Sequence, residues 1–270
     1  MMHRYLFVGG LHRSGTSLLA RLAGRVPGVG AITGAPVPEG EGVYLQGAIP
    51  HTARHGRPGA FAFDPAAHLV EGGVFDRLEV RDRLAADWAS WFPPDAPWRI
   101  EKSPVNMLRT RLYQQLFPLS QFVLVVRHPF AVARATAKWS DSPESRLLEH
   151  WGRAHALALD DMDWLHSGLV LRYEDIVAEP VRMLTALALF LDLDGPRGAA
   201  ISSLHGETVR DGNADYPMEK GESVIGAETA AAMAALGYGP DGTVSAPEIP
   251  RVRHPLRRVH EAVEAALSAE

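Results

Sequence analysis

The chain has 270 residues, of which 46% are hydrophobic and 22% charged, a composition typical of globular proteins with one or two domains. Its net charge of −5 argues against a general nucleic-acid-binding surface. The absence of cysteine excludes disulfides, a thiolate nucleophile and a cysteine-based metal site, and it fits a reducing compartment.

The sequence has no segment typical of membrane targeting. The apolar run near the N-terminus is too short for a signal peptide, and no segment approaches the roughly 18 apolar residues of a membrane span. The twelve histidines have no HExxH-type spacing. We therefore expect neither a membrane span nor a metal site.

The first predicted elements are a strand and a helix joined by a glycine-containing turn. Tyr5–Val8 is a short apolar run of the right length for a buried strand, and a helical pattern begins near Ser14. The first N–H groups of a helix have no partner within the helix and carry the positive end of its dipole. This arrangement predicts a site for a phosphate or sulfate group.

The turn can be compared with the ATP-binding P-loop, in which a glycine and four residues precede Gly-Lys-Ser/Thr. Gly10 and Gly15 have the required spacing, but Thr16 replaces the lysine that reaches the outer phosphates. The cation is Arg13, inside the turn. We therefore expect an anion site that is not suited to ATP-type phosphoryl transfer. The simpler alternative is an ordinary strand–turn–helix.

Residues 28–75 are rich in glycine and proline, which predicts a long loop without extended regular structure. Within it, residues 41–46 resemble a small ordered segment. The functional interpretation is a substrate-binding loop that carries a base. The alternative is a flexible surface loop with solvated glutamates.

Alternating strands and helices are predicted over the next part of the chain. An amphipathic helix is expected over residues 75–91 and a short strand over 98–101. Ser103 and Pro104 are expected to cap and begin a helix that ends near Phe117.

The clearest buried strand is residues 121–126, and Arg127 follows it directly. Ligands of open α/β sheets bind beyond the carboxyl ends of the strands, so Arg127 is expected near the turn at residues 9–17. The alternative for Arg127 is a surface salt bridge.

Further helices are expected over residues 130–139, after Pro143, after Pro180 and over residues 227–236, with one more strand over residues 169–173. This alternation predicts an α/β fold with a mostly parallel, doubly wound sheet. Residues 195–270 give a weaker signal than the rest.

Four separate stretches together resemble sulfotransferases that use 3′-phosphoadenosine 5′-phosphosulfate (PAPS). They are HRSGTSLL, EKSPVNMLRTRLYQQLFP, FVLVVRHPFAVARATAKW and LVLRYEDIVAEP, and with their spacing they cover residues 5–192. The bacterial single-domain sulfotransferases are the most similar group. The resemblance implies a three-layer P-loop-like α/β fold, with a mostly parallel central sheet flanked by helices, in one domain over residues 1–270. Its expected parts are a phosphosulfate loop at 9–17, an acceptor-side loop at 28–75 and a C-terminal segment at 195–270.

The resemblance also implies residues that bind PAPS. The 5′-phosphosulfate would be held by Arg13, Ser14, Gly15, Thr16 and Ser17. Arg127 would hold the 3′-phosphate and Tyr173 would contact adenine. The family usually has a serine eight residues after that arginine, where this chain has Ala135, so the hydroxyl is assigned to the neighbouring Thr136. The pair Lys220–Gly221 is similar to a late basic-glycine pair near the 3′-phosphate, although its surroundings do not match.

Transfer of a sulfuryl group requires a base for the acceptor proton and cations for the charge that develops on the transferring oxygens. By resemblance the cations are Arg13 and Lys102, the base is Glu41, and no metal is needed. Glu39, His51 and Glu101 remain alternatives for the base, although Glu101 is expected to be structural.

Two other functions compete with this one: a P-loop kinase or NTPase, and a non-catalytic nucleotide-binding relative. A kinase would need the missing lysine and a strand-end aspartate for magnesium. The acceptor is left open between a small molecule, a glycan and a lipid, and so is the oligomeric state. Because many sulfotransferases of secreted glycans are membrane-anchored, the lack of an anchor predicts a cytoplasmic enzyme.

Overall fold

The fold was analysed in a computed structural model that describes residues 3–193, 209–219, 221 and 223–268. Six strands form one sheet in the order β2-β3-β1-β4-β5-β6, and all are parallel except β6, which runs antiparallel to β5. The strands are β1 (Arg4–Gly9), β2 (Val29–Ala31), β3 (Trp98–Lys102), β4 (Gln121–Val126), β5 (Gly168–Arg172) and β6 (Val252–Arg253). The mostly parallel sheet expected from the sequence is confirmed.

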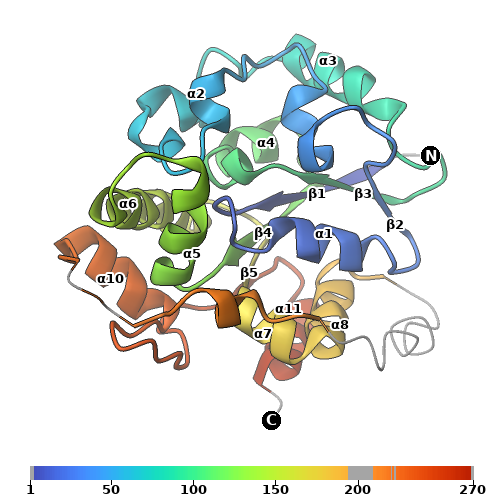
Figure 1. Cartoon of the computed structure of the whole chain (residues 1–270). Coiled ribbons are helices and arrows are strands. Elements are labelled where there is room, and N and C mark those ends of the chain that lie inside the picture. The colour runs from blue at the N-terminus through green and yellow to red at the C-terminus, as the bar shows by residue number, and fades with distance from the viewer. Residues whose placement is uncertain (1–2, 194–208, 220, 222, 269–270) are drawn as a thin grey trace.

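Helices cover both faces of this sheet (Figure 1). One layer packs on Leu6 and Val8 of β1 and consists of α1 (Thr16–Ala23), α7 (Tyr173–Ala178), α8 (Pro180–Phe190) and α11 (Arg257–Ser268). The other layer consists of α3 (Leu78–Ala89), α4 (Thr110–Leu116), α5 (Pro129–Thr136), α6 (Glu144–Met162) and α10 (Ala227–Leu236). The three-layer α/β architecture is therefore also confirmed.

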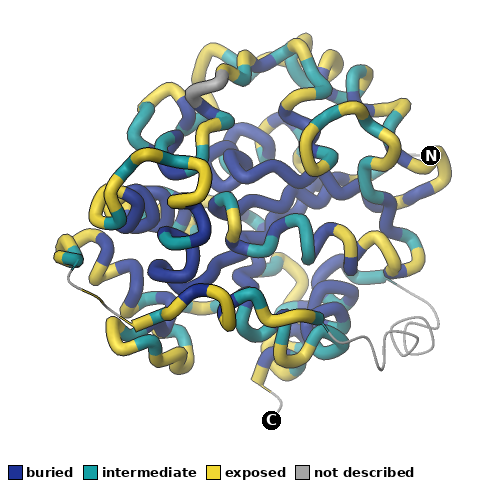
Figure 2. Tube along the Cα trace, in the orientation of Figure 1, coloured by how far each residue is buried: buried dark blue, intermediate teal, exposed yellow. Residues whose placement is uncertain are grey.

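The hydrophobic core follows from the alternation of side chains along the strands. On β1, Leu6 and Val8 face one helical layer, whereas Tyr5 and Phe7 face the other. All six residues of β4 are buried, which explains its continuous apolar sequence. Figure 2 shows the buried residues concentrated along the central strands.

The structure differs from the sequence-based expectation after β3. The single helix expected over residues 104–117 is a 3-10 turn at Pro104–Leu108 followed by α4, and Ser103 does not cap it with its side chain. The reason is tertiary. The Asn106 side chain donates hydrogen bonds to β1 and β3, and the backbone of Met107 lies 2.3 Å from where a Cβ of Gly9 would be. Close packing against β1 therefore replaces a regular helix.

Other differences are smaller. β2 and β6 were not expected, since three-residue and two-residue strands leave almost no periodic signal. Apart from β2, residues 28–75 form turns and one four-residue helix, α2 (Ala53–Gly56), as the glycine and proline content predicted. In the amphipathic helix α3, Leu84 and Trp88 are buried, whereas Leu78 at its first position is exposed. Among the described residues, no helix is both long and apolar enough to cross a membrane.

Candidate functional site

The turn between β1 and α1 forms the floor of a cavity at the carboxyl edge of the sheet. Gly10 and Gly15 both have positive φ, and a Cβ on either would clash with Val125 or Tyr173 at 2.3 and 2.6 Å respectively. Glycine is therefore required at both positions. Arg13 also has a positive φ of 70°, so the turn presents a cation in a conformation that arginine rarely adopts.

This cradle cavity has a volume of about 220 Å³. Its walls come from six separate parts of the chain and consist of His12, Arg13, Gly15, Thr16, Ser17, Glu39, Glu41, Pro104, Arg127, Trp139 and Tyr173. The structure thus brings together most of the residues predicted from the sequence. Ser14 is fully buried beneath the cavity and does not line it. Of the Lys220–Gly221 pair, Lys220 lies outside the described residues.

Arg127 is held rigidly at the end of β4 and is only 4% exposed. Its Nη1 donates to the carbonyl of Arg13 at 2.8 Å, and its Nε donates to Asn213 Oδ1 at 2.7 Å. The guanidinium lies 4.2 Å from the centre of the Tyr173 ring. Nη2 has no hydrogen-bond partner within the described part of the chain. The structure thus holds a buried cation with a free donor beside the cradle cavity, which is not the surface salt bridge considered as its alternative.

Thr136 is not brought to this site. Successive helical residues point about 100° apart, so Ala135 and Thr136 face different surroundings. Ala135 packs against Tyr216, whereas Thr136 lines a small separate cavity with Gly59 and Leu147. Thr136, to which the sequence assigned the hydroxyl near the 3′-phosphate, therefore faces away from Tyr216.

Two residues beside Arg127 were missed in the sequence, Lys138 and Tyr216. Lys138 Nζ lies 4.9 Å from the centre of the Tyr216 ring, and the guanidinium carbon of Arg127 lies 5.8 Å from it. Hydrogen bonding from Lys138, and then from Arg13, lowers the pKa of the Tyr216 hydroxyl. Lys138 and Arg13 thus both act on this hydroxyl, while Arg127 lies near the Tyr216 ring. Lys138 could have been found in the sequence, because it follows Ala135 by three residues and side chains at this spacing lie on the same side of a 3-10 turn. Nothing in the sequence marked Tyr216.

A buried ion pair borders the cradle cavity, which its carboxylate Glu41 lines. Lys102 Nζ donates to Glu41 Oε1 at 3.3 Å, and both side chains are at most 10% exposed. Burial raises the pKa of the Glu41 carboxyl, although Lys102 opposes this shift; the nearby Glu101 and Glu39 raise the pKa further. A carboxyl with a raised pKa beside an anion cradle is suited to accept a proton.

Glu39 also lines the cradle cavity, so both candidate carboxyls reach it. Glu39 has a positive φ of 51° and sits in a 3-10 turn that directly precedes Glu41. Glu39 is exposed, unlike Glu41.

Glu101 has the structural role expected from the sequence. It is fully buried, and its carboxylate accepts hydrogen bonds from Gly42 N at 2.9 Å, Ser103 Oγ at 2.6 Å and Asn106 Nδ2 at 2.5 Å. The three donors connect β3 with the Glu41 turn and the 3-10 turn after β3. Glu101 therefore fixes the backbone that carries Glu41 and Lys102.

We expect Glu101→Gln to destabilise the protein by about 1–3 kcal/mol, because the amide NH₂ would meet a donor and leave buried groups unpaired. Urea unfolding measures this loss. Glu149→Gln on the exposed part of α6, where Glu149 pairs with Arg146, is the matched control and should change stability by less than about 0.5 kcal/mol. Equal stability of both variants would contradict the structural role of Glu101.

The histidines near the site are neutral. His51, an alternative base, packs against Tyr44 at 4.7 Å and lines neither the cradle cavity nor the larger cavity beside it. Burial lowers its pKa to about 4. His12, which the sequence-based reading passed over, does line the cradle cavity, and burial also lowers its pKa to about 4.

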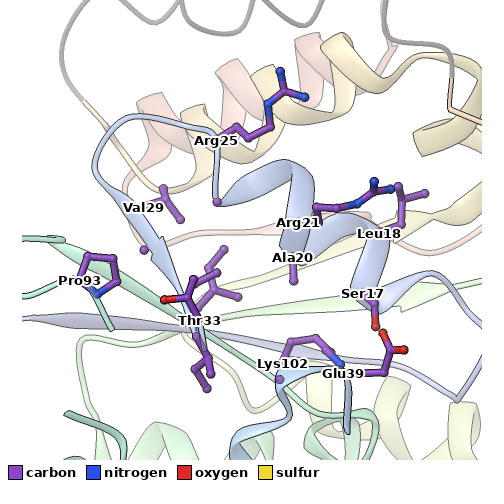
Figure 3. Close-up of a pocket in the computed structure, with 16 residues that line it drawn as sticks. Ser17, Leu18, Ala20, Arg21, Arg25, Val29, Thr33, Glu39, Pro93 and Lys102 are labelled. Carbon is purple, nitrogen blue, oxygen red and sulfur yellow. The ribbon is translucent and has the colours of Figure 1, made fainter. Parts of the chain in front are cut away.

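A larger cavity of about 690 Å³ adjoins the cradle cavity. Ser17 and Glu39 line both cavities, and Lys102 lines the larger one (Figure 3). The larger cavity continues along α1 to β2 and Pro93. An anion cradle, a buried acid–base pair and an adjoining cavity are the parts needed to transfer a group between two bound substrates. Among the described residues there is no cluster of three or more potential metal ligands.

Comparison with known proteins gives a family. The sequence pattern of the sulfotransferase family matches residues 6–196. The structure is similar to the sulfotransferase domain from the Synechococcus PCC 7002 olefin synthase, with 18% identity and a TM-score of 0.58, covering 88% of this chain and 95% of that domain. It is also similar to the sulfotransferase domain from the curacin biosynthetic pathway, with 16% identity and a TM-score of 0.54, covering 88% and 99%.

A third similar structure is sulfotransferase STF9 from Mycobacterium avium, with 14% identity and a TM-score of 0.51, covering 78% of this chain and 70% of that one. At these identities the likeness concerns the fold. The sequence matches none of the curated proteins with which it was compared.

Proposed function

The chain belongs to the sulfotransferase family, and from this we propose that it transfers a sulfuryl group from PAPS to a hydroxyl or amine of an acceptor. The observation that carries the proposal is that a pair of arginines and a buried glutamate–lysine pair meet at one cavity. Arg13 and Arg127 line the side that would hold an anionic donor, and the Glu41–Lys102 pair stands where a second substrate can approach. The whole of residues 1–270 is proposed to form a single sulfotransferase domain.

The residues present suit the anionic groups of PAPS. The backbone N–H groups at the start of α1, with Arg13, Thr16 and Ser17, would hold the 5′-phosphosulfate. Among the described residues Arg127 Nη2 is a buried donor without a partner, which fits a 3′-phosphate oxygen. Lys138 and the Tyr216 hydroxyl would complete that subsite in place of the hydroxyl lacking at Ala135, and Tyr173 would contact adenine.

The proposed reaction needs one base and two cations. The acceptor oxygen forms a bond to sulfur while the bond from sulfur to the bridging phosphate oxygen breaks, and 3′,5′-ADP leaves. Glu41 accepts the acceptor proton. Lys102 and Arg13 stabilise the negative charge on the transferring and bridging oxygens. No step requires a metal ion.

The competing kinase function is disfavoured by the loop itself. Thr16 stands where a P-loop kinase has its phosphate-binding lysine, and the ammonium of Lys102 is engaged with Glu41. A metal-dependent kinase would be stabilised by ATP with magnesium. We expect thermal stabilisation by 3′,5′-ADP in EDTA instead, and stabilisation by ATP only with magnesium would reverse the choice.

The 3′-phosphate subsite makes a separate prediction. Arg127→Ala and Lys138→Ala should each weaken 3′,5′-ADP binding by about 1.5–3 kcal/mol, the cost of a charge-assisted hydrogen bond. Neither variant should weaken the binding of 5′-AMP to a comparable extent, because 5′-AMP lacks the 3′-phosphate. Calorimetric titration measures binding of both ligands, with Arg257→Ala, at an exposed side chain of α11, as the control. Equal losses for both nucleotides would contradict the assigned subsite.

A further inference from the structure

The larger cavity has two chemically different ends. Figure 3 shows Ser17, Glu39 and Lys102 gathered at one end, whereas Val29, Pro93 and Arg25 lie toward the other. The first end adjoins the cradle cavity through Ser17 and Glu39, which line both. Its volume of about 690 Å³ lies within the roughly 300–1,000 Å³ typical of small-molecule sites. A molecule in this cavity would therefore place one end beside the transferring group.

The walls between these ends are aliphatic. They come from α1, β2, the loop after β2, the segment before β3, and β3 itself, and consist of Leu18, Ala20, Val29, Ala31, Ile32, Pro93 and Ile100. Of the described residues that line the cavity, none is aromatic. Such walls offer an aromatic acceptor no stacking partner, and they would leave most hydroxyls of a sugar without hydrogen bonds. They suit an alkyl chain.

Two cations line the cavity, Arg21 on α1 and Arg25 just beyond the end of that helix. Arg21 lies four residues after Ser17, so it is on the same side of the helix about 6 Å along its axis. Arg21 makes no ion pair within the described residues. Arg25 follows four residues later and also lines the cavity. The positive charge at this distance favours a carboxylate on the occupant.

We propose that the acceptor is an aliphatic alcohol that carries a carboxylate, a hydroxyalkanoate. This inference rests on the proposed sulfuryl transfer. The acceptor hydroxyl lies near Ser17 and the Glu41–Lys102 pair, the alkyl chain follows the aliphatic wall, and the carboxylate meets Arg21. The acceptor oxygen gains the sulfuryl group, its proton passes to Glu41, and 3′,5′-ADP is released. The product is an alkyl sulfate with a free carboxylate.

An acceptor panel with labelled PAPS tests this directly. The panel contains 6-hydroxyhexanoate and 10-hydroxydecanoate, the alcohols 1-hexanol and 1-decanol, 4-nitrophenol and glucosamine. We expect kcat/KM to be highest for a hydroxyalkanoate, about tenfold or more above the alcohol of equal length. Preference for 4-nitrophenol or glucosamine would overturn the proposal.

Variants of the cavity give a second test. Arg21→Gln should reduce the preference for hydroxyalkanoate over alcohol by about tenfold, whereas Arg153→Gln, on α6 in the opposite layer, should keep it. Thr33 is exposed and lines the cavity, so Thr33→Trp should fill it without disturbing the core and should abolish transfer to 10-hydroxydecanoate. Leu18→Trp, on the other wall, serves as the second filling variant.

Thermal stabilisation by 3′,5′-ADP separates the possible failures. The filled variants should keep this stabilisation, which shows that they are folded and bind nucleotide. If they also transfer to 10-hydroxydecanoate at the wild-type rate, the cavity is not the acceptor site and the inference is wrong. A wild-type protein that binds no 3′,5′-ADP overturns the proposed function, and this inference with it. A wild-type protein that binds the nucleotide but rejects every hydroxyalkanoate overturns the inference alone.

Discussion

Replacing Glu41 with glutamine is expected to reduce kcat by about 10²–10⁴, the usual contribution of a positioned general base. Glutamine keeps the shape of the side chain and its contact with Lys102 but cannot accept the acceptor proton. Affinity for 3′,5′-ADP should change little, because the proposed nucleotide contacts are made by other residues. Steady-state kinetics with a fixed acceptor and calorimetric titration of 3′,5′-ADP measure the two quantities separately.

The pH dependence adds a second signature for Glu41. A base must be deprotonated to act, so kcat should rise as the pH increases through its pKa. Because burial raises the pKa of Glu41, this rise should occur above the pH range of an ordinary glutamate, and it should be absent in Glu41→Gln.

Glu39→Gln is the matched comparison, since Glu39 lines the same cavity but is exposed. It should reduce kcat by less than Glu41→Gln does. The reverse order of the two effects would make Glu39 the base. Full activity in both variants would move the search to the neutral His12.

Lys102→Met is expected to reduce kcat by about 10²–10³, which is typical for the loss of one preorganised group that stabilises transition-state charge. Methionine retains a long apolar side chain in this buried position. The change also leaves the Glu41 carboxylate buried without its cationic partner. Because Lys102 lowers the pKa of Glu41, its loss should raise that pKa further and move the rise in kcat to still higher pH.

This shift distinguishes Lys102 from a residue that only supports the fold. A purely structural loss would reduce kcat equally at every pH and leave the profile in place. Lys102→Arg, which keeps the positive charge, should restore the position of the profile more fully than it restores the rate. An unchanged profile in Lys102→Met would contradict the coupling to Glu41.

Much of the fold could be predicted because its signals are local. The apolar run at residues 121–126 and the paired glycines of the cradle turn each specify one conformation from a few neighbouring residues. The place of Arg127 followed from a rule about parallel sheets, not from its own sequence context. For this reason it could be predicted from the sequence that Arg13, Arg127 and Glu41 line one cavity.

The rest depends on contacts between distant segments. Ser103 looks like a helix cap in the sequence, but its hydroxyl donates to Glu101 because both are buried against the turn that carries Glu41. Glu39 turns into the cavity because of a positive φ that glutamate seldom adopts. Tyr216 reaches Lys138 and Arg127 from a segment about 80 residues away in sequence, for which no periodic pattern exists.

The larger cavity could not be predicted from the sequence for the same reason. Its aliphatic wall combines α1 with β2, and β2 is a three-residue strand that the sequence did not reveal. The expected acceptor-side loop at 28–75 contributes only part of this wall. The side of α1 that bears Ser17 and Arg21 contributes the remainder, although the sequence had marked only its first turn.

Transfer of labelled sulfate from PAPS is the most direct test of the proposed function. The purified protein is incubated with labelled PAPS, EDTA and the acceptor panel, and the organic products are separated and counted beside the Glu41→Gln variant. The proposed function predicts a labelled organic sulfate with release of 3′,5′-ADP, and a loss of at least about 10² in rate for Glu41→Gln. No labelled product from PAPS, together with phosphate transfer from ATP when magnesium replaces EDTA, would contradict it.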